Sequence, residues 1–474
     1  MPSREDFYYE GFVKSLSFVP TPCQDELFRK VARFVTSDED LMVVNGYAGT
    51  GKTSAFAAVI ATLEGQRVHC SLMAPTGRAA KVLSLFAGRP ASTIHKKIYR
   101  QSTVSDQGWG KFSLNPNKDR ETLYICDEAS LIGIDTADQS RSLFGTGDLL
   151  ADLLSYVRSG RDCKLILIGD AAQLPPVGLD QSPSLSREVM TMFGASDFAT
   201  LSTVVRQQKE SGILHNATLI RHRITEEDVD SPLKLEVGGF DDISRVSGAE
   251  LIETITDAFD RFGEDETIIL CRSNKRANRF NAGIRSVVQF KEERLVRGDR
   301  LMIVKNNYRY AEGLENTAYI ANGDMAKLIS IGHYEDRYGL HFASARLSLP
   351  DYGDAEIRAK VILDTLESEQ ASLSAAQQEE LYHGVWADYA QVYKTKKKIW
   401  ECVREDDYFN ALQLKYANAV TTHKAQGGQW KCVFIDNPFW NGEYRLEDLK
   451  WLYTALTRAS EQVYLVNFKD ESFA

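Results

Sequence analysis

The segment that most constrains the fold is an eight-residue loop, GYAGTGKT at 46–53, which lies between two regular segments. The apolar run LMVVN at 41–45 precedes it and predicts a buried strand, and SAFAAVIATL at 54–63 follows it and predicts a helix. A strand, a glycine-rich loop ending in Gly-Lys-Thr and a helix form the P-loop arrangement, in which backbone amides and a helix N-terminus surround phosphate oxygens. The chain is therefore expected to bind a nucleoside triphosphate.

The residue types within the loop assign the chemistry. Lys52 is expected to reach the β and γ phosphates, and Thr53 to bind Mg²⁺. Tyr47 occupies a position of the pattern that tolerates many residues. The residues predicted to hold the nucleotide are Gly46, Ala48, Gly49, Thr50, Gly51, Lys52, Thr53 and Ser54.

A second apolar run, TLYIC at 122–126, ends in two acidic residues, Asp127 and Glu128. An acidic residue at the end of a strand is what an ATPase site requires beside its P-loop. Asp127 is predicted to hold Mg²⁺ through water, and Glu128 to polarise the attacking water.

Further apolar runs alternate with helical segments, which predicts parallel sheets with crossover helices. One set lies at 41–45, 68–74, 122–126 and 164–170, and a second lies at 267–271, 431–436 and 462–468. Between the first two runs of the second set lies a β-like stretch with Asn-Gly turn chemistry, at 298–332, followed by a polar helical segment at 371–393 and the basic run KTKKK at 394–398. The sequence therefore predicts two α/β domains and an inserted β-rich module.

Composition excludes several classes of protein. The seven cysteines are scattered and have no metal-ligand spacing, which predicts free thiols in a reducing cytoplasm. No apolar run approaches the ~20 residues that span a bilayer, so no membrane association is expected. A net charge of −10 argues against coating of nucleic acid by bulk electrostatics and leaves room for a local basic groove.

The segment GDAAQLPPVG at 169–178 resembles motif III of superfamily 1 helicases, where the Gln senses the γ-phosphate; Gln173 takes that place here. Further segments resemble the other motifs in order: APTGRAAKVL at 74–83 and STIHK at 92–96 (motifs Ia and Ib), LSTVVRQ at 201–207 (IV), TTHKAQGGQW at 421–430 (V) and YTALTRA at 453–459 (VI). The set covers nearly the whole chain and is similar to the RecD-like and Dda-like group of superfamily 1B.

The resemblance implies an α/β fold of two tandem RecA-like P-loop motor domains, with an inserted β-hairpin (a pin) and an inserted SH3-like β-barrel domain. The first motor domain is expected at 1–215, with the pin at 97–121. The second is expected at 216–310 and 413–474, interrupted by the barrel and a helical extension at 311–412.

The resemblance also implies roles for individual residues. Arg206 and Arg458 are the candidates for an arginine that stabilises the transferring phosphoryl group, Gln24 is expected to read the adenine edge, which favours ATP, and Gly427 is expected near the nucleotide. The residues expected to contact DNA are Pro75, Thr76, Arg78, Lys81, His95, Trp109, Phe112, Thr422, His423 and Lys424. Structural roles for His95 and His423, and packing of Trp109 on its own domain, are open alternatives.

These motifs predict an ATP- and Mg²⁺-dependent DNA helicase, active as a monomer, that moves 5′ to 3′ on single-stranded DNA and opens duplexes at single-strand/double-strand junctions. A translocase that displaces proteins and a DNA-binding scaffold without unwinding activity are the alternatives. A GTPase is disfavoured because Asn274-Lys275-Arg276-Ala277 places Ala where a guanine-reading Asp is required.

Overall fold

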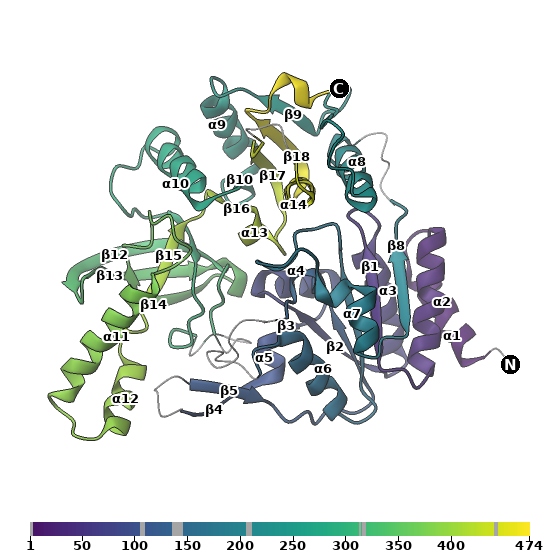
Figure 1. The fold of residues 1–474 in the computed structure, drawn as a ribbon, viewed down its shortest axis with the longest axis horizontal. Helices are drawn as coiled ribbons and strands as arrows, with labels where there is room; N and C mark the ends of the chain where they lie inside the picture. The colour runs from purple at the N-terminus through teal and green to yellow at the C-terminus, as the bar shows by residue number, and fades with distance from the viewer. Residues whose placement is uncertain are drawn as a thin grey trace. The chain divides into compact units, whose positions relative to one another are not determined.

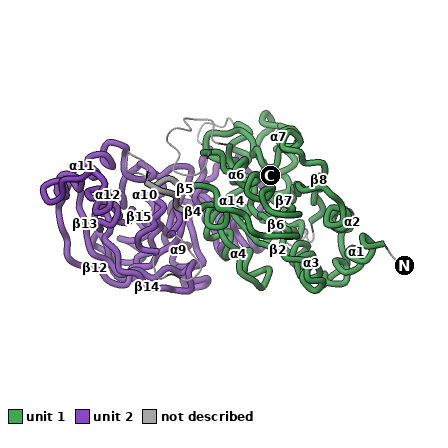
Figure 2. The backbone as a smooth tube through the Cα atoms, turned by 90° about the horizontal axis from the view of Figure 1, so that it is seen from below, with its two compact units in different colours: residues 1–232, 238–240, 443–457 green, residues 233–237, 241–442, 458–474 purple. Residues whose placement is uncertain are grey.

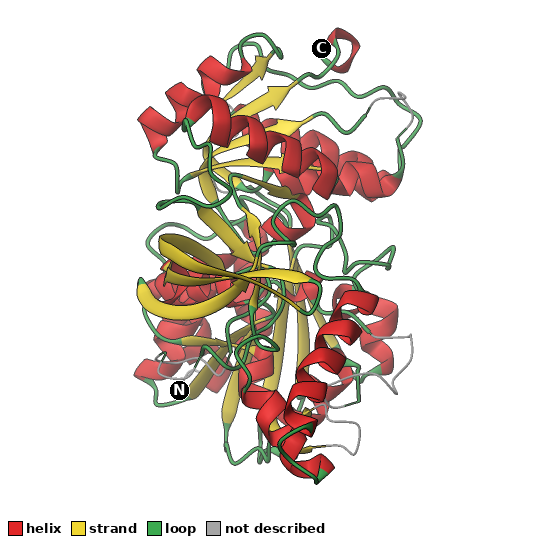
Figure 3. Cartoon of the chain, turned by 90° about the vertical axis from the view of Figure 1, so that its left-hand side faces the viewer, coloured by secondary structure: helices red, strands yellow, loops and turns green. Residues whose placement is uncertain are grey.

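The computed structural model describes residues 3–104, 110–134, 146–204, 211–311, 314, 319–439 and 444–474. The chain divides into two compact units, coloured separately in Figure 2. The first comprises residues 1–232, 238–240 and 443–457, and the second comprises 233–237, 241–442 and 458–474. In both units helices lie against the sheets (Figure 3).

The first unit is built on a six-stranded sheet in which all neighbouring strands pair in parallel. Its central strands are the apolar runs of the sequence, because a parallel sheet covered on both faces buries nearly every side chain. In spatial order the strands are β3 (Ala91–Thr93), β2 (His69–Ala74), β6 (Thr122–Cys126), β7 (Lys164–Gly169), β1 (Leu41–Gly46) and β8 (Asp197–Leu201).

Helices cover the two faces of this sheet and form two hydrophobic cores. One core contains Phe12, Phe28 and Val59, and the other contains Leu153 and Val157. These helices are α1 (Arg4–Ser15), α2 (Pro22–Thr36), α3 (Lys52–Gly65), α4 (Gly77–Ala87), α5 (Ile94–Ile98), α6 (Leu149–Ser159) and α7 (Arg187–Met192) (Figure 1). The same unit contains α8 (Gly212–Glu226) and α14 (Leu446–Leu456), which pack on each other.

The hairpin predicted within 97–121 is present. Strands β4 (Tyr99–Val104) and β5 (Gly110–Leu114) pair antiparallel, with Tyr99 opposite Leu114. Trp109 lies outside the described residues, and of Phe112 only the backbone, paired with Gln101, is described.

The second unit contains a five-stranded sheet whose neighbours also pair in parallel. In spatial order its strands are β16 (Ala419–Thr421), β10 (Thr267–Cys271), β17 (Trp430–Asp436), β18 (Ala459–Val466) and β9 (Ile243–Val246). Helices α9 (Leu251–Phe262), α10 (Asn274–Gly283) and α13 (Thr422–Ala425) accompany it. Two parallel sheets with crossover helices confirm the predicted pair of α/β domains.

The inserted module is a closed five-stranded barrel, which confirms the predicted barrel. Its strands are β11 (Arg300–Ile303), β12 (Met325–Arg337), β13 (Leu340–Leu349), β14 (Ala355–Ile362) and β15 (Leu412–Tyr416). They therefore extend beyond the expected segment 311–412 at both ends, and the domain boundaries stay a prediction. Helices α11 (Ala375–Ala390) and α12 (Lys396–Glu405) fill the connection between β14 and β15 and pack through Val385 and Trp400 on Phe342 of the barrel.

Two further expectations bear on the whole chain. The seven cysteines, all within the described residues, form no disulfide. None of the helices in the described part of the chain combines the length and apolar character that a membrane crossing requires.

Candidate nucleotide-binding and DNA-contacting sites

The loop 46–53 connects β1 to α3, as its pattern predicts, and its glycines have a steric reason. Gly49 and Gly51 have φ of 74° and 76°, in the left-handed region that glycine adopts without strain. A Cβ at Gly46 would lie 2.5 Å from Lys52 Cγ. Glycine at 46 therefore leaves the room in which the Lys52 side chain folds back over the loop.

The Lys52 ammonium is held by groups of its own unit. It donates to the carbonyl of Gly46 and, at 3.2 Å, to the carbonyl of Tyr47. Its Nζ lies 4.0 Å from Asp170 Oδ2 at the end of β7. A phosphate that binds Lys52 therefore has to compete with these oxygen atoms.

Asp127 and Glu128 follow β6 and lie at the same edge of the sheet. Asp127 Oδ1 accepts the Glu128 amide at 2.8 Å, and Glu128 has a φ of 52°, an uncommon left-handed conformation for a side chain of this size. Burial, and then the Glu128 carboxylate, raise the pKa of Asp127 to about 6. A cation at this position would favour the ionised form of Asp127.

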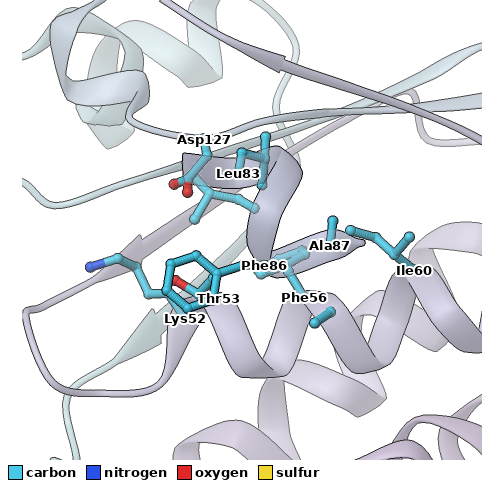
Figure 4. Close-up of a pocket in the computed structure, with 10 residues that line it drawn as sticks. Lys52, Thr53, Phe56, Ile60, Leu83, Phe86, Ala87 and Asp127 are labelled. Carbon is cyan, nitrogen blue, oxygen red and sulfur yellow. The ribbon is translucent and has the colours of Figure 1, made fainter. Parts of the chain in front are cut away.

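Lys52, Thr53 and Asp127 line one small cavity, of about 10 Å³. Figure 4 shows their polar ends gathered on one side, with the apolar side chains of Phe56 and Ile60 on the other. The described residues contain no group of three or more His, Cys, Asp or Glu side chains that could hold a metal ion. One hydroxyl and one carboxylate fit Mg²⁺, which is commonly bound by one or two carboxylates together with substrate phosphates.

Gln173 lies just past β7, where motif III predicts it. It is 5% exposed, and its Oε1 has no hydrogen-bond donor among the described residues. A buried acceptor without a donor is costly, so this amide is suited to accept a hydrogen bond from a bound ligand or water.

Helix α14 supplies two residues that the sequence did not single out. Tyr453 Oη accepts the Ala48 amide at 2.9 Å and donates to Asp170 Oδ2 at 2.7 Å, and Thr454 Oγ1 accepts the Leu174 amide at 2.8 Å. The sequence feature that could have pointed to them is the pair of hydroxyl residues at the start of YTALTRA, before the apolar Ala and Leu. Only Arg458 of that motif had been given a role.

Gln24, expected to read adenine, is completely buried at the start of α2. Its Oε1 accepts the Thr21 amide at 3.0 Å and its Nε2 donates to Thr50 O at 3.1 Å. Both polar groups thus have partners within the protein, and the adenine contact stays a prediction. Ser54 lies exposed on α3.

Tyr47 also has a defined contact. Its ring lies 4.7 Å from the guanidinium carbon of Arg221 on α8, a cation–π distance. The unusual residue of the loop is therefore packed by its own unit.

Of the two predicted arginines, the structure describes Arg458 but not Arg206. Arg458 lies in the second unit, 5% exposed, and donates to Gly428 O at 3.2 Å, next to Gly427, whose φ is 74°. Arg206 lies outside the described residues.

The motif Ia and Ib residues surround the starts of two short helices in the first unit. Thr76 caps α4 by accepting the Ala79 amide at 3.2 Å, and Pro75, Arg78 and Lys81 beside it are half-buried. His95 on α5 lies 5.5 Å from the ring of Tyr99, and burial lowers the pKa of His95 to about 4. His95 is therefore neutral near pH 7 and brings no positive charge to a phosphate.

The motif V residues lie on and beside α13 in the second unit. Thr422 is fully buried, and neither its Oγ1 nor Lys424 Nζ has a hydrogen-bond partner among the described residues. Burial, and then the neighbouring Lys415, lower the pKa of Lys424 to about 8. His423 next to them is half-buried.

Comparison with known proteins agrees with this arrangement. A sequence model of the AAA domain matches residues 23–233, and a model of the UvrD-like helicase C-terminal domain matches residues 416–466. The chain is 25% identical over 483 residues to the ATP-dependent DNA helicase dda of Enterobacteria phage T4, covering 94% of this chain and 99% of the phage protein. The chain is thus similar to superfamily 1B helicases over nearly its whole length.

Two other helicases are similar to this chain at lower identity or over less of its length. The ATP-dependent RecD2 DNA helicase of Deinococcus radiodurans is 30% identical over 182 residues, which is 38% of this chain and 22% of that protein. A crystal structure of the Pif1 helicase from Bacteroides, in complex with ADP-AlF3 and single-stranded DNA, aligns over 97% of this chain and 95% of that one, with 16% identity and a TM-score of 0.47.

Proposed function

We propose that this chain is an ATP-dependent DNA helicase that translocates 5′ to 3′ on single-stranded DNA, as a monomer, and separates duplexes. The observation that carries the proposal is the joint position of Lys52, Thr53 and Asp127 around one cavity at the strand ends of a parallel sheet. The relative that matches nearly the full chain is named as an ATP-dependent DNA helicase.

In this proposal each polar group at the cavity has one task. Lys52 stabilises the charge on the β and γ phosphates, and Glu128 orients the attacking water. Thr53 and Asp127 hold Mg²⁺, which neutralises phosphate charge when it is bound. The amide oxygen of Gln173, which has no donor among the described residues, accepts a hydrogen bond from a group that is bound in the site.

The arginines complete the proposal. Arg458 and Arg206 are proposed to place positive charge against the transferring phosphoryl group. In related motors such an arginine is presented by a second domain, so that hydrolysis depends on domain closure. The Gly428 carbonyl that accepts from Arg458 orients its guanidinium in the second unit.

DNA is proposed to contact the motif Ia, Ib and V residues through its sugar-phosphate backbone, because a motor must pass any sequence. The charged members of this set are Arg78, Lys81 and Lys424, and the neutral His95 contributes shape and hydrogen bonding. The hairpin β4–β5 is proposed as the pin that splits the duplex, with Trp109 and Phe112 as the aromatic residues that act on the separating bases.

The test combines ATP hydrolysis with strand separation. Hydrolysis stimulated by single-stranded DNA, together with unwinding of a duplex that has a 5′ single-stranded tail, is the expected result. Unwinding only of 3′-tailed duplexes would overturn the direction. DNA-stimulated hydrolysis with displacement of a bound protein but without unwinding would identify a translocase, and no hydrolysis at all would identify a scaffold.

A further inference from the structure

The hydroxyl of Tyr453 lies between the P-loop and the end of β7, and its position has a consequence for Lys52. Tyr453 is 1% exposed, accepts the Ala48 amide at 2.9 Å and donates to Asp170 Oδ2 at 2.7 Å. Burial and the Asp170 carboxylate raise the pKa of Tyr453, so that the hydroxyl keeps the proton that it donates.

Asp170 is completely buried and depends on its partners. Its Oδ1 accepts the Ala172 amide at 3.0 Å. Its Oδ2 has two partners, the Tyr453 hydroxyl and, at 4.0 Å, the Lys52 ammonium. A buried carboxylate is costly unless donors or a cation compensate it, so Asp170 retains Lys52 more strongly when Tyr453 is absent.

A bound nucleotide requires the Lys52 ammonium at its phosphates. We propose that the Tyr453 hydroxyl is a positioning group for nucleotide binding, which keeps Asp170 hydrogen-bonded while Lys52 moves from Asp170 to the phosphates. Through the same hydroxyl, the Ala48 amide fixes the start of the loop against α14. The inference rests on the proposed role of Lys52 and adds Tyr453 and Asp170 to it.

The chain contains a matched control for a purely structural role. Tyr99 donates to Asp152 Oδ2 at 2.7 Å, and both residues are buried in the same unit. Tyr99→Phe removes a hydrogen bond of the same chemistry and length, between β4 and α6, which carry none of the residues assigned to the nucleotide.

The experiment measures equilibrium binding of a non-hydrolysable ATP analogue with Mg²⁺ to the full chain, together with thermal unfolding. Tyr453→Phe is expected to weaken analogue binding about tenfold or more, the effect of losing one hydrogen bond to a charged group. Tyr99→Phe is expected to bind within about twofold of wild type while losing similar thermal stability. Equal weakening in both variants, or binding by Tyr453→Phe within about twofold of wild type, would overturn the proposal.

A rescue variant tests the mechanism directly. Asp170→Asn removes the charge that retains Lys52, so it should bind the analogue at least as tightly as wild type. In the Asp170→Asn background, Tyr453→Phe should then weaken binding much less than it does in the wild type, because no carboxylate charge is left to compensate and only the contact with the Ala48 amide is lost. Additive losses in the double variant, or weaker binding by Asp170→Asn alone, would contradict the proposal.

Failure of the underlying site has a different signature. Lys52→Ala should lose analogue binding or hydrolysis whatever residue occupies 453. If Lys52→Ala behaved as wild type, the proposed nucleotide site would be wrong, and the positioning role of Tyr453 would be overturned with it. Loss of binding in Lys52→Ala with wild-type binding in Tyr453→Phe would overturn the role of Tyr453 alone.

Discussion

The P-loop in the first unit and the motif V segment in the second each contain a lysine that we propose to bind phosphate, but the surroundings of the two lysines differ. Lys52 is held by two backbone carbonyls and lies near Asp170, whereas Lys424 Nζ and the Thr422 hydroxyl are buried without partners among the described residues. The first lysine gives up existing contacts when its ligand binds, and the second gains contacts that it lacked. The nucleotide site should therefore be tuned by competing groups within the protein, and the motif V site by charge and pH.

The largest effects are expected at the nucleotide site. Lys52→Ala should lower ATP hydrolysis by about 10³-fold, because it removes the charge that stabilises the transferring group.

Glu128→Gln should retain ATP binding and lose turnover by about 10² to 10³-fold, because Gln cannot accept the proton of the attacking water. Steady-state hydrolysis with single-stranded DNA and equilibrium nucleotide binding check both, with the exposed Glu188→Gln as a control. Near wild-type turnover of Glu128→Gln would exclude it as the base.

Arg458→Ala tests whether the second unit contributes to the reaction at the first. It should lower kcat by about 10³-fold and ATP affinity far less, since an arginine finger acts mainly on the transition state. Single-turnover hydrolysis and nucleotide binding separate these quantities. Equal losses in rate and affinity would instead show that Arg458 contributes to ground-state binding.

At motif V the expected effect is smaller and concerns DNA. Lys424→Ala should weaken single-stranded DNA binding about tenfold and reduce the slope of log K against log salt by about 0.7, the contribution of one phosphate contact. Lys431→Ala on β17 is the matched control, because Lys431 is an exposed lysine of the same unit that lies 3.7 Å from Glu461. Fluorescence anisotropy at several salt concentrations measures both. An unchanged slope in Lys424→Ala would remove this lysine from the DNA interface.

The smallest effect is a pH dependence that should distinguish the two lysines. Because the pKa of Lys424 is lowered to about 8, its charge is complete below that pH and is lost as the pH rises through it. A phosphate stabilises the charged form, so DNA affinity should fall by a few-fold above pH 8 in the wild type and stay flatter in Lys424→Ala. Titration of DNA affinity from pH 7 to 9 measures this, and identical profiles would show that Lys424 does not face phosphate.

The sequence predicted the central strands because each contains a run of apolar residues, such as LMVV in β1 and IILC in β10. The edge strands β3, β8 and β9 are three to five residues long and carry little pattern, and they were not predicted. Helix α1 has no such run; it is fixed by a Ser3 capping box and by Phe12 packing on Phe28.

Some functional residues could likewise be predicted from the sequence and others could not. Lys52, Thr53 and Asp127 could be assigned because loop and strand patterns fix their positions. Tyr453 could not, because the last eight residues of α14 are all buried and periodicity cannot show which side meets the P-loop. Lys424 was predicted from its motif, but its lowered pKa was not, because that shift comes from burial and from the charge of Lys415, which lies on a barrel strand.

The membership of residues 443–457 in the first unit has a consequence for synthesis. A ribosome makes the P-loop early and α14 near the end of these 474 residues, with the whole barrel in between. Until α14 has emerged, the Ala48 amide and Asp170 lack their hydroxyl partner, so the nascent first unit has an incomplete nucleotide site. If the first unit folds before α14 has been made, the proposal for Tyr453 predicts that the nascent chain binds ATP more weakly than the finished chain does.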